Sequence, residues 1–415
     1  MLLRFTLLIL LLPLFQGCSS IARGITEAVL EQDNVEYQRK CQVFGRPFEG
    51  LEKAWSNQQP DEIRELRLLV VHGAGNYRSG YADAMNYSIA ERLGLTRVDA
   101  RPLSIDLPQG KSLGVEYPSA KVAVTRFRNA QNNRQLLVFE LSYVDITRQD
   151  KMQLAFDESS AMTNQRVAVN KQLKEMLNMH ASDPMIYLGP TGDLIRGAVS
   201  QTMCMMLRAD WNQLTSQQAV PCDENYQHKL PDNTHYAIVT HSMGSRVVID
   251  VLQDNAETSV NKASFEPLFK ERRLPVFMLS NQLQLMQLGR TAPNEFHQER
   301  DYCSAHSADF DKRLVRDLEL ISITDPNDIF SYTVPQSFVD EFVDARLCPS
   351  LINVVTQVAV PINILGMTEL AEPMTAHKGY FSDTKVLDVI AFGLNGALLN
   401  SEGHASCRWN DVVED

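Results

Sequence analysis

The sequence predicts an α/β protein with a mostly parallel sheet flanked by helices. Five short apolar runs have the continuous hydrophobicity of strands buried on both faces, and they cover residues 66–71, 135–141, 236–239, 275–279 and 318–323. Helical periodicity lies between the runs, with Val247 and Val251 on one face of a helix that starts near Ser242, and with Val386 and Val389 on a last helix. Strands that alternate with helices favour a layered α/β sheet.

Two regions depart from this alternation. Residues 122–127 and 135–143 flank the polar segment 129–133, which predicts an antiparallel hairpin within or beside the sheet. Residues 144–233 contain helical patterns around 167–177 and 194–206, followed by a polar loop. We therefore expect a helical insertion, or cap, before the strand at 236–239. Its methionines either fill a core or line an adaptable apolar pocket.

Composition limits the class of protein. The 415 residues are 44% apolar and 22% charged, with 18 Pro and 20 Gly, which is typical of a globular chain. Because 39 Lys and Arg stand against 51 Asp and Glu, the net charge is −12, and no nucleic-acid partner is expected. The length would allow two domains, but one α/β unit over residues 61–415, after a tether at 18–60, accommodates the motifs described below.

The first residues predict export. A basic start at residues 1–4 precedes an apolar run over 5–14, about half of the ~20 residues that cross a bilayer as a helix, as in a secretion signal. The run ends in Leu-Phe-Gln-Gly-Cys at 14–18, which resembles the lipobox of bacterial lipoproteins, with Phe15 where Leu is usual. The resemblance implies a signal peptide over 1–17, a lipid on Cys18, and membrane anchoring in the bacterial cell envelope, at the outer membrane facing the periplasm or the surface. A plain signal peptide that leaves Cys18 as a thiol is the alternative.

The remaining cysteines agree with an oxidising compartment. Once Cys18 is set aside, six are left, an even set compatible with three disulfides: Cys41, Cys204, Cys222, Cys303, Cys348 and Cys407. Fifteen pairings are possible, and short loops favour Cys204–Cys222 and Cys303–Cys348. The sequence has neither Cys-x-x-Cys nor His-Glu-x-x-His, so it indicates no zinc site, and we expect no metal or cofactor.

A candidate nucleophile lies between a strand and a helix. The segment Thr240-His241-Ser242-Met243-Gly244 directly follows the strand at 236–239. A tight turn at such a point lifts a serine hydroxyl above the sheet edge and places it at a helix N-terminus. The segment resembles the nucleophile elbow of α/β-hydrolases, Gly-x-Ser-x-Gly, with Thr240 at the first glycine, and its His-Ser-Met-Gly core is similar to that of many lipases and esterases. The alternative is a serine that only caps the helix.

A second motif, His72-Gly73-Ala74-Gly75, follows the strand at 66–71. In the resembled fold, one oxyanion-hole donor is the residue after the nucleophile and the other comes from a His-Gly loop after an early strand. The resemblance therefore nominates the N–H groups of Met243 and Ala74. A dinucleotide-binding loop competes with this interpretation, but the third glycine falls off the Gly-x-Gly-x-x-Gly spacing. A purely structural glycine turn is a further alternative.

The chain order Ser, acid, His in α/β-hydrolases nominates the remaining triad members. Asp325 and Asp328 follow the strand at 318–323, and Asp328 better resembles the acid of the family. Asp325 is the alternate acid, and since it precedes a proline it also suits a turn cap. His377 is expected on a loop just before the last helix, where the histidine of the family stands, whereas His404 lies beyond that helix as an ordinary surface residue.

The resemblance implies a serine hydrolase that cleaves carboxylic esters, of the lipase or esterase kind, with an ester or acyl-lipid substrate. In this scheme Ser242 attacks the acyl carbonyl, His377 transfers the proton, and Asp328 orients the imidazole. Acyl transfer through the same acyl-enzyme is one alternative. A non-catalytic surface lipoprotein that uses this scaffold for binding is another.

Overall fold

The computed structural model describes the chain in ten segments: residues 41–56, 62–107, 119–215, 233–257, 269–295, 302–359, 362–364, 368–371, 373–394 and 407–410. The expected signal peptide, the lipid site Cys18, most of the tether, Cys222 and His404 lie outside these residues. Within the ten segments, no helix combines the length and the apolar character needed to cross a bilayer.

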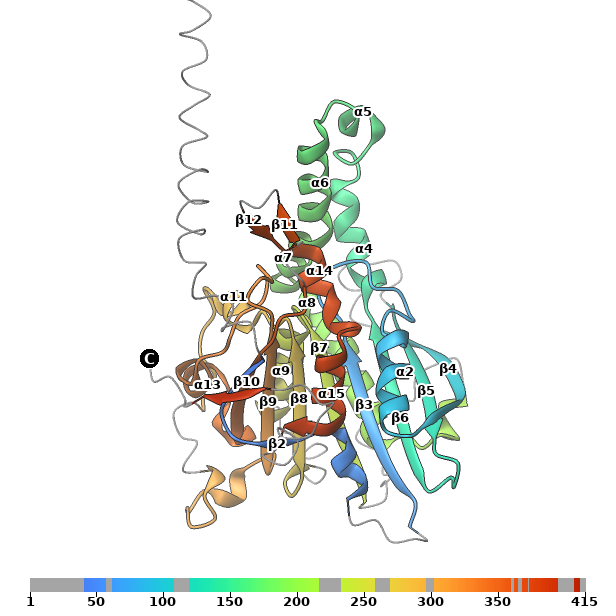
Figure 1. Ribbon diagram of the computed structural model, residues 1–415, viewed down its shortest axis with the longest axis vertical. Coiled ribbons are helices and arrows are strands. Elements are labelled where there is room, and N and C mark those ends of the chain that lie inside the picture. Colours follow the sequence, from blue (N-terminus) through green and yellow to red (C-terminus); the bar gives the residue numbers. More distant parts are fainter. Residues whose placement is uncertain are drawn as a thin grey trace, which may run out of the picture.

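A ten-stranded sheet forms the centre of the molecule, in the order β14-β1-β10-β9-β8-β7-β3-β6-β5-β4 (Figure 1). The predicted strands pair parallel with one another, and one further strand, β10, extends the series. In sheet order the parallel strands are β10 (Pro349–Val355), β9 (Asp317–Thr324), β8 (Arg273–Leu279), β7 (Thr234–His241), β3 (Arg64–Val71) and β6 (Arg134–Ser142). The prediction of a mixed α/β fold with a mostly parallel sheet is confirmed.

Antiparallel pairs flank the parallel strands on both sides. On one side β5 (Ser119–Arg128) forms the predicted hairpin with β6 and continues to the edge strand β4 (Thr96–Asp106). On the other side β1 (Gln42–Phe44) lies antiparallel to β10 and parallel to β14 (Arg408–Asn410). Two-stranded pairs complete the strands: β2 (Phe48–Glu49) with β13 (Gly393–Leu394), and β11 (Ile362–Ile364) with β12 (Thr368–Leu370).

Helices cover both faces of the sheet and divide the core in two. Along β3, Leu66, Leu68 and Val70 pack with α2 (Asp83–Arg92) and α15 (Thr384–Phe392). Leu69 and Val71 instead pack with α8 (Thr191–Arg208) and α9 (Gly244–Glu257) on the other face. This alternation is the period of two of a β-strand. Shorter helices lie in the loops: α11 (Leu283–Gln287), α13 (Gln336–Phe342) and α14 (Pro373–Lys378).

The segment between β6 and β7 is helical from Val144 to Arg208. Its helices are α4 (Val144–Lys151), α5 (Ser160–Thr163), α6 (Ala168–Met176), a π-helical turn (Leu177–Ala181), α7 (Ser182–Leu188) and α8. Figure 1 shows α5 and α6 projecting beyond the edge of the sheet at which the parallel strands end. Of the expected insertion over residues 144–233, we keep the name cap for residues 144–191. By contrast, α8 returns to the sheet, where the buried guanidinium of Arg67 donates to the carbonyls of Met206 (2.8 Å) and Ala209 (2.7 Å) at its C-terminal end.

Disulfides join distant parts of the described chain. Cys303 is bonded to Cys348, as the short-loop argument predicted. Cys41 is bonded to Cys407, so the bond links the two ends of the described chain beside the paired strands β1 and β14. Cys204 is also disulfide-bonded, and its predicted partner Cys222 lies outside the described residues.

Candidate active site

Ser242 occupies a strained turn between β7 and α9. Its φ of 56° lies in the left-handed region, which costs a residue other than glycine about 1–3 kcal/mol. The turn is held because the Ser242 N–H donates to the carbonyl of Leu279 at the end of the neighbouring strand β8 (2.9 Å). Helix α9 begins two residues later, at Gly244. The strand, turn and helix expected around Ser242 are therefore present.

Two glycines allow the His-Gly loop to lie directly on this turn. A Cβ atom at Gly73 would lie 2.5 Å from the Cβ of Ser242 and 2.9 Å from the backbone N of Met243. A Cβ atom at Gly244 would lie 2.6 Å from the carbonyl oxygen of His72. Since contacts this short require the backbone to move, both positions need glycine, and the two predicted motifs form one packed unit.

Thr240 fits where the resembled motif has glycine. Its hydroxyl is buried and lies 2.9 Å from the hydroxyl of Ser245 in the first turn of α9. A second contact joins it to the carbonyl of Phe277 on β8 (3.4 Å). Because the hydroxyl has hydrogen-bond partners, the larger side chain is accommodated without an unsatisfied buried group.

His72 fixes the shape of the His-Gly loop. Its Nδ1 lies 2.7 Å from the carbonyl of Gly73 and must donate, so its Nε2 accepts from the backbone N–H of Tyr143 (3.1 Å). The Tyr143 hydroxyl donates in turn to the carbonyl of His72 (2.7 Å). Burial lowers the pKa of His72 to about 3. His72 is therefore a neutral ring with both nitrogens occupied, which suits a structural role.

The cap holds the same loop from the other side. The N–H of Gly75 donates to the Asp183 carboxylate on α7 (2.6 Å), and that carboxylate pairs with Lys151 on α4 (2.7 Å). His180, in the π-helical turn, lies 3.2 Å from the carbonyl of Ala74. Asp183 and His180 were not predicted as site residues, because cap residues more than 100 positions from the loop carry no local signal for this contact.

The two nominated oxyanion-hole donors lie at the junction of the two motifs. Ala74 and Met243 are both buried. Within the described residues, neither backbone N–H donates a hydrogen bond, although most buried backbone N–H groups have acceptors. Two N–H groups without acceptors beside a serine can donate hydrogen bonds to the carbonyl oxygen that becomes negative when a serine attacks an acyl group.

His377 and Asp328 meet as the chain order predicts. The Nδ1 of His377 lies 3.1 Å and 3.2 Å from the two carboxylate oxygens of Asp328. A carboxylate can only accept, so Nδ1 donates to it, and in the neutral form of the ring the lone pair is on Nε2. Burial alone would raise the pKa of Asp328, but hydrogen bonds from His377 and Ser280 and the charge of His377 bring it below its ordinary value.

His377 lies on the short helix α14, so the prediction of a loop at this position was wrong. The helix starts with Pro373, whose fixed φ suits the first helical position. Because α14 has only six residues, it is too short for a helical period to be visible in the sequence.

Ser280 is a site residue that the sequence analysis missed. Its hydroxyl donates to Asp328 (2.5 Å) and lies 2.8 Å from Nδ1 of His377. Its φ is 51°, and its N–H donates to Ile323 at the end of β9, which repeats the turn geometry of Ser242 one strand further along the sheet. A polar Ser-Asn pair directly after the apolar run of β8 was the available signal.

Asp325, the alternate acid, has other partners. Its carboxylate accepts from the backbone N–H groups of Val358 (2.8 Å) and Ala359 (2.9 Å), and from that of Asn327 (2.8 Å). These contacts cap the turn after β9 and attach it to the loop after β10. The structure brings Asp328, and not Asp325, to His377.

A second buried histidine supports His377. The ring of His241 lies with Nε2 2.7 Å from the carbonyl of His377, so Nε2 donates and Nδ1 is free to accept from the Tyr77 hydroxyl (3.5 Å). Burial, with the neighbouring His377, lowers the pKa of His241 to about 3. His241 is therefore a neutral donor that fixes the backbone of α14.

The hydroxyl of Ser242 is buried and makes no hydrogen bond in this structure. Proton transfer to His377 would use a hydrogen bond between Ser242 Oγ and His377 Nε2, and this bond is not formed here. Such bonds are often long in a free enzyme and tighten when substrate binds. The described site thus contains a held imidazole–carboxylate pair, two free N–H groups and a serine hydroxyl without a partner.

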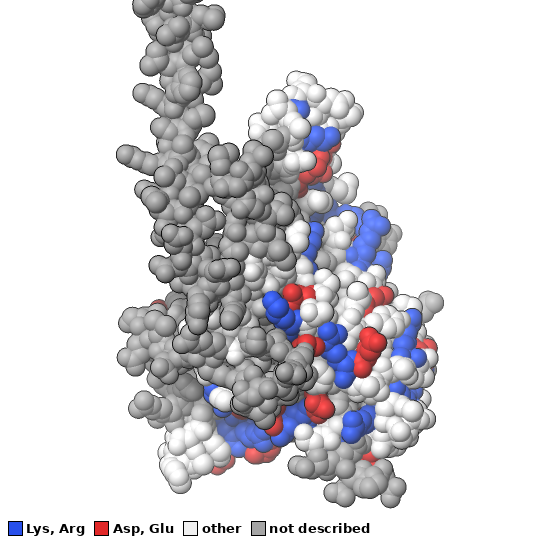
Figure 2. Space-filling model, viewed as in Figure 1, with Lys and Arg blue, Asp and Glu red and all other residues white. Residues whose placement is uncertain are grey.

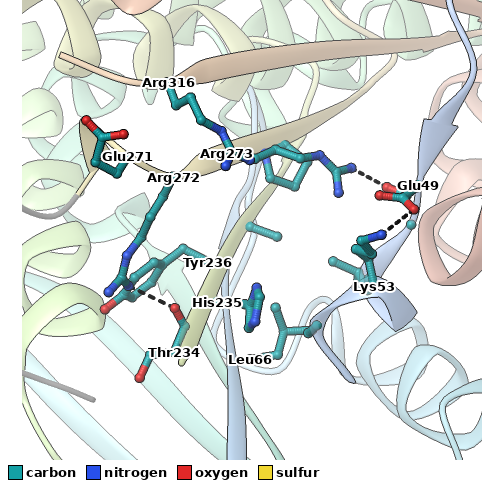
Figure 3. A pocket seen from close by; sticks show the side chains of 15 residues that line it. Glu49, Lys53, Leu66, Thr234, His235, Tyr236, Glu271, Arg272, Arg273 and Arg316 are labelled. Atoms are coloured by element: carbon teal, nitrogen blue, oxygen red, sulfur yellow. Dashed lines mark hydrogen bonds and ion pairs between the residues drawn. The ribbon is translucent and has the colours of Figure 1, made fainter. Parts of the chain in front are cut away.

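A cavity of about 240 Å³ lies at the opposite edge of the sheet, where β7 and β8 begin (Figure 3). Two of the positive side chains that line it have acceptors: Arg272 donates to the carbonyl of Thr234, and Lys53 donates to Glu49, both drawn as dashed lines in Figure 3. Since β7 rises about 3.3 Å per residue, some 23 Å separates this cavity from the Ser242 end of the strand. The cavity is therefore separate from the Ser242 site.

Within the described segments, no group of three or more His, Cys, Asp or Glu side chains is arranged to hold a metal ion. Comparisons with family models, with curated proteins and with solved structures find no match for this chain.

Proposed function

We propose that this chain is a serine hydrolase with an α/β-hydrolase-like fold, which cleaves carboxylic esters and is anchored in the bacterial cell envelope through a lipid on Cys18. The observation that carries the proposal is the position of three side chains at one sheet edge. Ser242 lies in a left-handed turn after β7, Asp328 follows β9, and His377 presents Nδ1 to that carboxylate.

These groups can perform acyl transfer to water in two steps. The Nε2 lone pair of His377 accepts the hydroxyl proton as Ser242 Oγ attacks the acyl carbonyl, and the N–H groups of Ala74 and Met243 stabilise the oxyanion. The imidazolium then gives its proton to the leaving alcohol, and an acyl-Ser242 ester remains. Water, deprotonated by the same imidazole, releases the acid and restores the serine. Asp328 keeps Nδ1 protonated throughout.

The test is hydrolysis of p-nitrophenyl esters of increasing acyl length by the full mature chain. We expect turnover that Ser242→Ala abolishes and that Ser104→Ala, at an exposed position on β4, leaves unchanged. Loss of activity in both variants or in neither contradicts the proposal, as does the absence of turnover by the folded wild-type chain at every acyl length. Adding a primary alcohol and measuring the ester formed distinguishes acyl transfer from hydrolysis.

A further inference from the structure

Exposed apolar side chains gather on the cap. Among the described residues, fifteen large hydrophobic side chains are exposed, and eight of them lie between residues 152 and 188. Phe156 and Met185 have exposed fractions of 75% and 73%, and Met152, Val167, Leu173 and Leu177 are each at least half exposed. We call the eight exposed side chains of residues 152–188 the cap surface. A soluble protein rarely gathers so much apolar surface without a partner.

The cap surface lies at the same edge of the sheet as Ser242. Four further exposed apolar residues follow strands that end at this edge: Leu285 and Leu288 after β8, and Ile329 and Tyr332 after β9. Figure 1 shows α5 and α6 standing clear of the body at this end of the molecule. A flat apolar partner could therefore meet the cap without first meeting the rest of the described chain.

The charges of the cap are largely neutralised within it. Residues 144–191 contain five Lys and Arg and six Asp and Glu, whereas the whole chain has a net charge of −12. Within the cap, Arg166 and Lys174 pair with Asp157, and Lys151 pairs with Asp183. On the face drawn in Figure 2, uncharged atoms cover most of the outer end of the cap. The cap is thus close to neutral in an acidic protein, so a phospholipid surface repels it little.

We propose that the cap surface docks on the surface of a phospholipid bilayer. The side chains involved are Met, Leu, Val and Phe, and none of the eight is a Tyr, Trp or Arg, the residue types that dominate binding hot spots between proteins. Short helices that place such side chains in the headgroup region bind by apolar burial. The inference deepens the proposed function and rests on it, because docking brings the Ser242 edge towards acyl lipids.

The predicted lipid anchor would tether the protein to the bilayer but would not orient it. The chain from Cys18 to Cys41 can extend to about 80 Å at most, which exceeds the ~50 Å diameter expected for a body of this size. A lipid on Cys18 would therefore keep the protein near the bilayer without selecting which face meets it. Docking through the cap surface would provide the orientation.

The experiment measures vesicle binding without the covalent lipid. The full mature chain carrying Cys18→Ser, exported behind an ordinary cleavable leader, is floated with phosphatidylcholine vesicles. We expect binding that changes little from about 50 mM to about 500 mM salt, because apolar burial is not screened. Changing both Phe156 and Met185 to Ser should weaken binding about 100-fold. The matched control changes Ile63 and Val98, exposed by 64% and 55%, to Ser and should bind as before.

Several outcomes would overturn the docking proposal. These are the absence of flotation, equal binding by both double variants, or binding that needs anionic lipid and disappears in high salt. Self-association that is lost in the cap variant, without vesicle binding, would assign the surface to a second copy of the chain. Hydrolysis of the p-nitrophenyl ester series described above separates this proposal from the function: flotation without turnover at any acyl length retains docking and refutes the esterase, and turnover without flotation does the reverse.

Discussion

Gly73→Ala is the substitution that most directly perturbs the packing of the His-Gly loop on the nucleophile turn. The added Cβ would lie 2.5 Å from the Cβ of Ser242, where ordinary carbon contacts are about 3.5 Å or longer, so the two segments must separate by about 1 Å. That shift moves the N–H of Ala74 relative to the Ser242 hydroxyl. A displacement of about 1 Å between catalytic groups can reduce the rate about 100-fold. We therefore expect kcat/KM for a short p-nitrophenyl ester to fall by about that factor.

The matched control is Gly197→Ala on α8. There the nearest atom to an added Cβ is Leu107 Cδ2 at 3.5 Å, which is ordinary contact, and alanine favours the helix. We expect this variant to keep full activity and to melt at the same temperature or slightly higher. The reasoning is refuted if Gly73→Ala keeps wild-type kcat/KM and melting temperature, or if the two variants lose activity equally.

Three further predictions concern the acid, the core and a cross-link. Asp328→Asn should lower kcat about 10⁴-fold with little change in melting temperature, because the imidazole loses the partner that fixes its tautomer. Asp325→Ala should instead cost about 2–3 kcal/mol of unfolding free energy, because three backbone N–H groups lose their acceptor. Ester assays and thermal melts separate the two effects. Glu140 accepts from the N–H groups of Gly80 and Ala82, and burial raises its pKa from 4.5 to about 7. Between these two pKa values the folded chain keeps the Glu140 proton and the unfolded chain loses it. The unfolding free energy, measured by urea titration, should therefore fall by up to about 3 kcal/mol from pH 4.5 to pH 7 relative to Glu140→Gln. The same pH dependence in both proteins would contradict this. Cys41→Ala should lower the unfolding free energy, measured by chemical denaturation, by about 2–5 kcal/mol. The loss should exceed that in Cys303→Ala, because the Cys41 disulfide closes a loop of 366 residues rather than 45. An equal loss in the two variants would contradict this dependence on loop length.

The sequence predicted the centre of the sheet because continuous apolar runs are a local property. Each of the five predicted runs lies within a parallel strand. The edge strand β4 was missed, since its first four residues are exposed and two of them are charged, as is common in edge strands. The ten-strand order and the place of β10 depend on contacts between distant segments, and no local pattern encodes them.

In the candidate site, too, the residues with a local sequence signal were predicted and those defined by long-range contacts were not. Ser242 and Gly73 were found because each motif follows an apolar strand, and the position of Asp328 followed from the strand before it. Ser280 and Asp183 were missed because their roles come from long-range contacts to His377 and to the His-Gly loop. The helix at His377 was missed because it is only six residues long.

The central claim is that Ser242 is a nucleophile activated by His377. The direct measurement is mass spectrometry of the full mature chain after treatment with a fluorophosphonate, with peptide mapping of the adduct. The account predicts one adduct, on Ser242, which forms much more slowly in His377→Ala and is absent from heat-unfolded protein. Labelling elsewhere in the chain, or labelling of Ser242 at the same rate without His377, would contradict it.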